Sequence, residues 1–315
     1  MKNLILFLIG FLIVFFAQAQ VTNYGVGSGT QGISSSYFGE NAGSMNMNST
    51  RGNTFIGTNS GQATDTGGFN TFVGAISGRY NTDGTHNTFV GMSAGHNNTE
   101  GRYNTFIGLA AGRYNTEGIF NTIIGTYAGG KNEKGCCNVY IGTETAYENV
   151  NGKSNVFIGY HAGRNDTNSY KLHIANNQYS SLIYGDFTKK QVIIGYVKPN
   201  TLAKNLHQDY KLGVLGKLIA EEVRVTPQVN WPDYVFAKDY TLTPLNELEN
   251  QIQELGHLPN IPAAEEVEAE GFELGAMNAK LLEKVEELTL YLIELNKEVQ
   301  QLKKENQILK GQNQK

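Results

Sequence analysis

The chain has 315 residues, a formal net charge of −4 at pH 7, and charged side chains at 17% of its positions. This length suits one elongated protein or two small domains. The mildly acidic balance argues against nucleic acid and against an anionic membrane surface as partners.

The first 19 residues form a predicted secretory signal peptide. Lys2 precedes an apolar run from Leu4 to Phe16, and the small residues that end at Ala19 predict cleavage after that residue. A retained membrane anchor is the alternative, but the run is too short to span a bilayer comfortably. Cleavage removes Lys2, so the mature charge is 24 − 29 = −5. We therefore expect an exported protein, extracellular or on the outer cell surface with the periplasm as a further location, without membrane insertion after cleavage. Residues 20–34 are an expected linker.

Residues 35–176 consist of copies of one short unit. Asn53 begins the pentapeptide Asn-Thr-Phe-Ile-Gly, and related pentapeptides follow every 17 residues as far as Asn155. A degenerate copy begins at Ser35 and a worn copy at Lys171. A fixed short period is typical of stacked units that cannot bury a core alone. Each unit supplies one short strand rich in aromatic and β-branched residues, so we expect a mainly β fold, a parallel β-roll or solenoid.

The glycines of the unit have two predicted roles. The Asn-Thr-x-Gly segment, represented by Gly67 and Gly84, is predicted to turn with its glycine at positive φ. Small residues around the second glycine, represented by Gly61 and Gly78, indicate close approach of the backbone.

One stretch, Gly125–Asn132, imitates a phosphate-binding P-loop. It reads GxxxxGK as far as Lys131, but Asn132 stands where such a loop has Ser or Thr. Gly125 and Gly129 fall on the glycine positions of the repeat. We therefore interpret these glycines as structural and expect no nucleotide or other cofactor.

Alternate residues of each strand face opposite ways, which separates an aromatic row from an aliphatic row. A coil this small has room for one row inside, and the other row would form an apolar stripe too large to leave in water. We expect self-association about an axis along the stack to cover it. The aromatic row is Phe55, Phe72, Phe89, Phe106, Tyr140 and Phe157, and the aliphatic row is Ile56, Val73, Val90, Ile107, Ile124, Ile141 and Ile158.

The Asn-x-x-[Ile/Val]-Gly core of the repeats resembles the head of trimeric autotransporter adhesins over about residues 35–176. The resemblance implies a left-handed parallel β-roll in which three chains pack side by side, so the chain's first partner would be itself, as a homotrimer. Members of that family end in a membrane anchor, whereas this chain ends in Gln-Asn-Gln-Lys. Anchoring by the chain itself is therefore not expected.

Residues 177–273 are predicted to form a small α/β neck. Thr243 is expected to cap a helix that has Pro244 at its first position and Gly256 at its end. The other expected elements are short strands at 182–187, 192–195 and 222–226, an aromatic segment at 231–236 and a short helix at 263–270.

A seven-residue repeat predicts a parallel coiled coil over residues 274–310. Glu298 and Lys303 are at facing flank positions, which suits a parallel register. Val with Leu in the core favours a coiled coil of two helices, whereas the head implies three chains. We expect three helices, because the fused head fixes the local stoichiometry. A single amphipathic helix folded onto its own domain is the alternative. The predicted oligomer core, which Leu281 precedes, is Val285, Leu288, Leu292, Leu295, Val299, Leu302, Asn306 and Leu309.

Three further segments resemble the C-terminal modules of secreted Bacteroidetes proteins described as tail-fibre-like, over about residues 210–310. They are W-P-D-Y-V-F, H-L-P-N-I-P and the helix L-L-E-K-V-E-E-L-T-L-Y. The resemblance implies architecture and trimerisation. Some tail-fibre proteins cleave themselves beside an S-D-x-R motif, which this sequence lacks, so self-cleavage is not expected.

No catalytic or metal site is predicted. The six histidines are scattered without the spacing of metal ligands. Asp83, Glu100 and Glu117 share one repeat position and could line up to hold Ca²⁺, but Lys134 interrupts the column, so a solvated edge is expected. No Ser-His-Asp order or acid–base pair is recognised.

The two cysteines, Cys136 and Cys137, are adjacent in an exported chain. They either form a disulfide between neighbouring chains of the oligomer or are free thiols at a turn.

The candidate ligand contacts recur at the two positions after the second glycine. They are Arg79, Tyr80, Arg113, Tyr114 and Arg164, and such side chains stack on and hydrogen-bond to glycans or protein surfaces. We expect a secreted or cell-surface fibre, adhesin-like and non-enzymatic, that binds a multivalent extracellular glycan or protein. The alternatives are a passive spacer or assembly component of an extracellular appendage, and a solenoid polysaccharide hydrolase.

Overall fold

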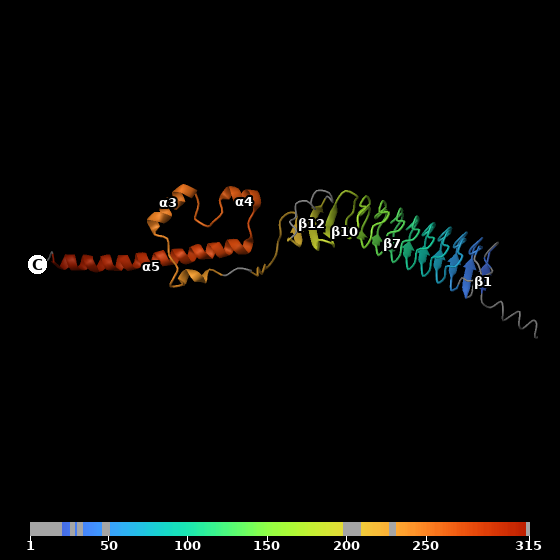
Figure 1. Cartoon of the computed structure of the whole chain (residues 1–315), viewed down its shortest axis with the longest axis horizontal. Helices are drawn as coiled ribbons and strands as arrows, with labels where there is room; N and C mark the ends of the chain where they lie inside the picture. Colours follow the sequence, from blue (N-terminus) through green and yellow to red (C-terminus); the bar gives the residue numbers. More distant parts are fainter. Residues whose placement is uncertain are drawn as a thin grey trace, which may run out of the picture. The chain divides into compact units, whose positions relative to one another are not determined.

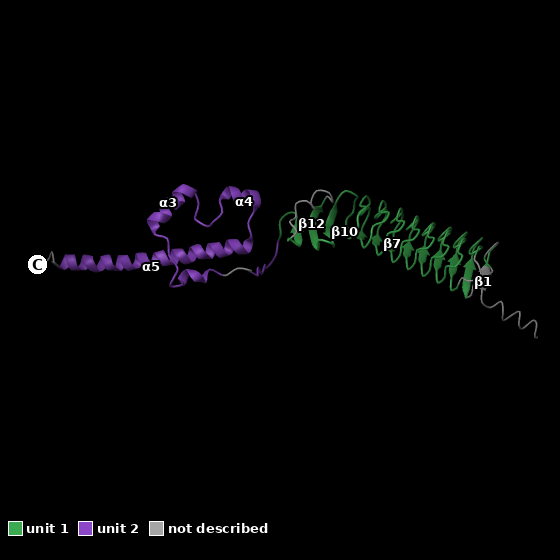
Figure 2. Ribbon diagram, viewed as in Figure 1, with its two compact units in different colours: residues 1–218 green, residues 219–315 purple. Residues whose placement is uncertain are grey.

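The computed structural model describes residues 21–25, 29, 34–45, 51–197, 209–226 and 231–312. The chain divides into two compact units, residues 1–218 and residues 219–315 (Figure 2). The predicted signal peptide and most of the predicted linker lie outside the described residues.

The first unit is a parallel β-solenoid of about ten turns, and the predicted 17-residue repeat and mainly β fold are confirmed (Figure 1). Equivalent residues of successive repeats are register partners, so that Phe55 pairs with Phe72 and Phe72 with Phe89. The parallel strands are β1 (Val21–Tyr24), β2 (Ser35–Phe38), β3 (Thr54–Ile56), β4 (Thr71–Val73), β5 (Thr88–Val90), β6 (Thr105–Ile107), β7 (Thr122–Ile124), β8 (Val139–Ile141), β9 (Val156–Ile158) and β10 (Lys171–Ile174).

Two antiparallel strands end the parallel stack. β11 (Ser181–Asp186) pairs antiparallel with β10 and with β12 (Gln191–Val197), and β13 (Leu212–Val214) is parallel to β12. The strands expected at 182–187 and 192–195 are therefore present. Residues 222–226 are exposed and form no strand, because no described segment pairs with them. The alternating pattern there was misleading.

The aromatic row fills the inside of the solenoid, as one row was expected to do. Phe55, Phe72, Phe89 and Phe106 are all 0% exposed. Their rings stack in parallel, with centroids 4.7–4.8 Å apart and interplanar angles of 4–8°. Because the strand spacing fixes the ring spacing, each turn buries its aromatic side chain only by stacking on the next turn.

Two rows of buried asparagines bind the turns together beside this core. In the first row, Asn87 Oδ1 accepts a hydrogen bond from the backbone N–H of Asn104 at 3.0 Å, and its Nδ2 donates to the carbonyl of Gly101 at 2.8 Å. In the second row, Asn98 Nδ2 donates to Asn81 Oδ1 at 2.7 Å. The bonds of the first row satisfy backbone groups that the three-residue strands leave unpaired, whereas the Asn98–Asn81 bond joins two side chains. The first row is Asn53, Asn70, Asn87, Asn104, Asn121, Asn138 and Asn155, and the second is Asn81, Asn98, Asn115, Asn132 and Asn149.

The second glycine of each repeat is required by close packing and by its backbone conformation. Gly95 has φ +57°, and a Cβ there would lie within 2.7 Å of three ring carbons of Phe89. The predicted close approach is confirmed. The predicted positive φ of the Asn-Thr-x-Gly glycine is wrong, because Gly84 and Gly101 lie outside the left-handed region. Glycine is needed there because a Cβ at Gly101 would collide with Asn98 Oδ1 and with the carbonyl of Gly118 in the next turn.

The second unit consists of short elements and one long helix. The 3₁₀ helix η1 (Pro232–Phe236) packs on α5 (Leu274–Gln312), and between them along the chain lie α3 (Leu245–Leu255) and α4 (Ala264–Glu270). Gly256 ends α3 in the left-handed conformation, as expected. Within the described residues, no helix has both the length and the apolar character needed to cross a membrane.

The predicted cap of α3 is wrong by one position. Pro244, and not Thr243, is the N-cap residue, and no side chain bonds to the first turn. The backbone carbonyl of Thr243 instead accepts a hydrogen bond from the hydroxyl of Tyr291 on α5. Thr243 therefore ties the segment before α3 to the long helix.

Candidate functional site

The outer side of the solenoid strands is an apolar face two columns wide. Ile56, Ile107 and Ile141 of the aliphatic row are 41%, 38% and 37% exposed. The neighbouring column consists of Thr from Thr54 to Thr122 and of Val at the next two turns. We call these two columns the strand face. At the end of the stack it continues into an apolar cavity of about 520 Å³ whose wall includes Ile158, Ile174, Leu182 and Tyr196.

The predicted oligomer core of α5 is also exposed within this chain. Leu288 and Leu295 are 56% and 54% exposed, and Val299 is 38% exposed. We call this stripe, which runs from Leu281 to Leu309, the heptad seam. Among its members, Asn306 donates a hydrogen bond only to the carbonyl of Leu302, one turn earlier.

Contacts of α5 with its own chain are made by other sides of the helix. The hydroxyl of Tyr234 donates to Glu283 at 2.8 Å, and that of Tyr240 donates to Glu287 at 2.6 Å. Glu283 and Glu287 lie four residues apart on one helix face beside the segment 234–240, and Tyr291 continues this face to Thr243. Leu288 and Leu295 lie next to this face but are more than half exposed, so these contacts do not cover the heptad seam.

The candidate ligand contacts lie on one edge of the solenoid and pair with each other. The guanidinium of Arg79 lies 5.2 Å from the ring centre of Tyr80, and that of Arg113 lies 5.4 Å from Tyr114. Arg164 has no such tyrosine after it; its Nε donates to Glu144 at 2.7 Å. Each predicted Arg–Tyr pair is thus formed within one turn, and the arginine covers one face of its tyrosine ring.

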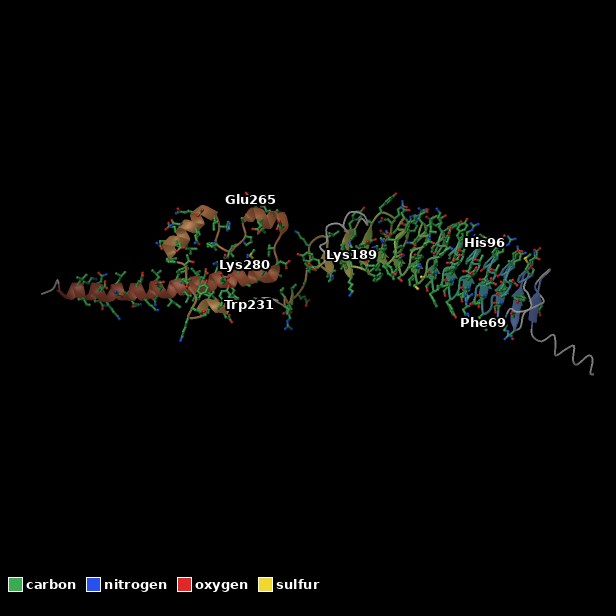
Figure 3. All side chains as sticks on the ribbon, viewed as in Figure 1. Phe69, His96, Lys189, Trp231, Glu265 and Lys280 are labelled. Carbon is green, nitrogen blue, oxygen red and sulfur yellow. The ribbon has the colours of Figure 1, made fainter. Side chains whose placement is uncertain are left out.

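The opposite edge carries an aromatic row that sequence reasoning missed. Phe69, His86, Tyr103 and Phe120 stack with ring centres 4.8–5.0 Å apart, although Phe69 is 58% exposed. Figure 3 shows Phe69 and His96 at opposite edges of the solenoid. Each ring of the row precedes the asparagine of its repeat, which was the available signal. Because the rings cover one another, mainly their edges face solvent, so the row is a poor platform for stacking a ligand.

The P-loop-like stretch has no phosphate cradle. Strand β7 precedes it, but turns follow where a P-loop has a helix. Lys131 Nζ lies 2.7 Å from Glu148 Oε2, one turn further along the solenoid. The column of acidic residues is a solvated edge in which Lys134 pairs with Glu117 at 2.7 Å. Among the described residues, no group of three His, Cys, Asp or Glu side chains could hold a metal ion.

Both cysteines carry free thiols within this chain. Cys137 is exposed, whereas Cys136 is half-buried, and burial raises the pKa of the Cys136 thiol. Cys137 is therefore the more accessible of the two for a bond to another chain or to a reagent.

The last turn of the solenoid contains a buried polar cluster. His173 occupies the core column and is the register partner of Phe157. Its Nδ1 lies 2.7 Å from Ser181 Oγ, and its Nε2 lies 2.8 Å from Asp166 Oδ2. The side chains of His173 and Asp166 are 1% and 8% exposed. No Ser-His-Asp arrangement is recognisable in the sequence, but the fold brings Ser181, His173 and Asp166 together from three different segments.

A polar cavity of about 400 Å³ adjoins this cluster. Its wall includes Asp166, His173, Gln178, Tyr179, Ser181 and Tyr184. Burial alone would raise the pKa of Asp166, but hydrogen bonds from His173 and Asn168 outweigh it and hold that pKa below its ordinary value. Burial, followed by the nearby carboxylates, raises the pKa of Tyr184 to about 12. At neutral pH the cavity therefore holds a carboxylate acceptor and a protonated phenol.

The contacts of His173 differ from those of a nucleophilic triad. In such a triad the carboxylate binds Nδ1 and the hydroxyl binds Nε2, whereas here the two ring nitrogens are exchanged. The backbone N–H groups of Tyr179 and Ser180 both donate to Asn177 Oδ1, at 2.8 and 2.9 Å, so neither is available to stabilise an oxyanion. The arrangement is thus better suited to holding a ligand than to acyl transfer.

No family model, no curated protein and no solved structure matches the chain.

Proposed function

We propose that the protein is an exported, homotrimeric surface fibre that presents repeated contacts to an extracellular ligand. One observation carries the proposal: each of the two units leaves one regular apolar face without a partner in its own chain. The strand face and the heptad seam both repeat along an axis, so each can be covered by the same surface of another copy.

The occupant of the heptad seam is a second and third copy of the same helix. A seven-residue repeat of apolar residues is the pattern by which parallel helices pack. Glu298 and Lys303 are at flank positions that meet between neighbouring parallel helices, and Glu305 and Lys310 repeat this pairing one heptad later. Asn306 lies in the core, where a single polar residue favours one register.

The occupant of the strand face is the strand face of the other copies. A face of Thr, Val and Ile in parallel register has no charge to oppose its own copy, and β-branched side chains pack closely at a regular spacing. Three chains packed in this way are what the resemblance to trimeric adhesin heads implies. The predicted β-roll geometry and the predicted signal peptide belong to the same proposal.

Native mass tests the assembly. Light scattering on the mature chain should give three times the chain mass. Leu295→Asp in the heptad seam and Ile107→Asp in the strand face should each weaken the trimer, and together they should give monomers. Lys297→Asp and Arg102→Asp introduce the same aspartate at exposed positions outside both faces and should leave the mass unchanged. A wild-type chain that is monomeric at micromolar concentration would refute the proposal.

Three copies raise the effect of any weak ligand contact on the surface. Linked binding increases avidity by about 10²–10⁴ without a new contact, provided that the ligand reaches several sites at once.

Retention of the trimer on immobilised polysaccharide or on cells tests ligand binding. A trimer that binds nothing in such a panel would instead support the passive spacer, and shortened polysaccharide chains would support the hydrolase. N-terminal sequencing of protein from the medium and the cell envelope tests export and cleavage after Ala19.

A further inference from the structure

We propose that the polar cavity at the last turn of the solenoid is a binding site for a neutral saccharide. The inference deepens the proposed ligand binding and rests on it only in taking the protein to meet glycans outside the cell. The cavity belongs wholly to the first unit, and its wall is formed by residues 163–184.

The chemical groups of the cavity wall indicate the class of ligand. The wall is formed by amide, hydroxyl, carboxylate, imidazole and phenol groups, and it contains neither Lys nor Arg. An anion would have no Lys or Arg partner there, and Asp166 would repel it. The cavity also lacks the grouped carboxylates that a metal ion needs. A neutral ligand with many hydroxyl groups fits this set, because hydroxyls both donate to a carboxylate and accept from a phenol. A volume of about 400 Å³ lies within the usual range of ligand sites, about 300–1,000 Å³.

Two side chains in the deep part of the cavity, Tyr184 and Asp166, would fix the ligand. Tyr184 is only 5% exposed, yet its hydroxyl makes no hydrogen bond to the described residues. Asp166 Oδ1 accepts from Asn168, and Asp166 Oδ2 accepts from His173, which holds the carboxylate in one orientation. The Tyr184 oxygen is reached from the cavity, so a ligand can supply its hydrogen-bond partner. A saccharide hydroxyl between Tyr184 and Asp166 would be such a partner.

The exposed part of the wall carries Tyr179 and Gln178 on one loop. Tyr179 is 68% exposed, and a tyrosine ring can cover the apolar face of a sugar ring. The neighbouring Gln178 has an amide that bonds to no described residue, so it is free to bind a ligand hydroxyl. The loop that carries both is fixed by Asn177, whose Oδ1 accepts from the backbone N–H groups of Tyr179 and Ser180. The cavity thus combines buried polar anchors with an aromatic side chain on a held loop, as sugar recognition requires.

The position of the cavity is compatible with the proposed trimer. The turn that contributes Gly163, Asn165 and Asp166 to the wall follows β9, so it lies off the strand face. Coverage of the strand face by other copies would leave this turn uncovered, whereas Asn177, Ser180 and Ser181 also line the apolar cavity at the end of that face. A trimer would present three such polar cavities.

The experiment measures binding of neutral monosaccharides and disaccharides to the full mature chain. The probes are glucose, galactose, mannose, N-acetylglucosamine and N-acetylgalactosamine with their simple disaccharides. Binding is detected first by saturation-transfer NMR, and the affinity is then measured by calorimetry. Tyr184→Phe removes only a hydroxyl that no group of the described residues bonds, so the fold should be retained while affinity falls about tenfold. Tyr179→Ala at the exposed wall should weaken binding by a similar factor. Tyr127→Ala is the matched control and should change nothing, because it removes an exposed tyrosine on an earlier turn, one repeat after Ala110 at the equivalent position. Tyr80→Ala tests the Arg–Tyr edge as the competing site.

The outcomes separate this inference from the proposed fibre. Binding of one sugar class that is lost in Tyr184→Phe and Tyr179→Ala but kept in Tyr80→Ala supports the cavity. Absence of binding to every probe overturns it, and a trimeric mass in the same sample leaves the fibre proposal standing. Binding lost only in Tyr80→Ala also overturns it and moves the site to the Arg–Tyr edge. Turnover of a chromogenic acetate ester that Ser181→Ala abolishes would replace binding with hydrolysis and overturn it as well.

Discussion

A methyl group added at Gly95 should destabilise the solenoid strongly, because the space it needs is occupied by a ring that cannot move freely. The new Cβ would lie within 2.7 Å of three carbons of Phe89. The Phe89 ring is held between Phe72 and Phe106, with ring centres 4.7 and 4.8 Å away. The alanine would also have to adopt φ near +57°.

The magnitude follows from these two costs. An alanine in the left-handed region costs about 1–2 kcal/mol, and overpacking of a well-packed core costs about 1–3 kcal/mol. Roughly 2–5 kcal/mol of unfolding free energy should therefore be lost in Gly95→Ala. For a unit of this size, each kcal/mol shifts the Tm by about 2–4 °C, so a fall of about 4–20 °C is expected. Circular dichroism melts at one fixed protein concentration measure it, since association would otherwise shift the Tm.

The chain contains its own version of this substitution. Ala146 occupies the second-glycine position of its turn with φ 53°, beside Tyr140. There the stack is disturbed, with Tyr140 and Phe157 5.4 Å apart and tilted by 32°. This turn therefore accommodates an alanine beside a tyrosine ring that is not parallel to the next ring.

A double-mutant cycle identifies the ring as the cause. At the turn where Ile123 replaces the aromatic residue, a Cβ at Gly129 would meet only one side-chain carbon closer than 3 Å. Gly95→Ala should therefore cost less in a Phe89→Ile background than in the wild type. An unchanged Tm in Gly95→Ala, or an equal loss in both backgrounds, would refute the reasoning.

Three further outcomes are expected. Thr64→Asn should raise unfolding free energy by about 1 kcal/mol in denaturant titrations, because the buried Thr64 hydroxyl has no partner where later turns carry the second row of asparagines. Burial raises the pKa of Asp186, but the hydrogen bonds that its carboxylate accepts, first that from Lys171, outweigh burial and lower this pKa to about 2. The contribution of Asp186 to folding stability should therefore be fully present above about pH 4 and decrease toward pH 2, and Asp186→Asn should flatten this pH dependence in thermal melts. Lys131→Ala removes an exposed ion pair with Glu148 and should leave the Tm nearly unchanged. ATP should shift the Tm of neither form, and saturable ATP binding that the variant loses would contradict the structural role of these glycines.

The repeat made most of the first unit predictable. A constant spacing from Asn53 to Asn155 fixes the register, and alternation along the strand separates the aromatic row from the aliphatic row. The aromatic row lies inside because its rings stack at the spacing of the strands, as the rings of Phe72 and Phe89 do. The φ of Gly84 was not predictable from turn chemistry, because packing against the next turn, and not chain reversal, is what requires a glycine there.

The polar cluster was harder to predict because its members belong to the worn end of the repeat. Asp166, His173 and Ser181 come from a loop, from β10 and from β11, and the last pairs antiparallel where a further repeat would be parallel. One signal was present: alignment of the final copy places His173 in the core column, where Phe157 stands one turn earlier. A titratable side chain in a column of buried rings needs partners, and searching the nearest loops for them would have suggested Asp166 and Ser181.

The register of the solenoid also has a genetic consequence. Each turn touches only its neighbours through equivalent residues 17 positions apart, as Asn87 does with Asn104. Gain or loss of one whole repeat by slippage during replication would therefore rejoin equivalent surfaces and leave the polar cluster at the last turn unaltered. Each such event would change the length of the solenoid by about 4.8 Å. The length of the solenoid could thus change in uniform steps without a new interface at each step.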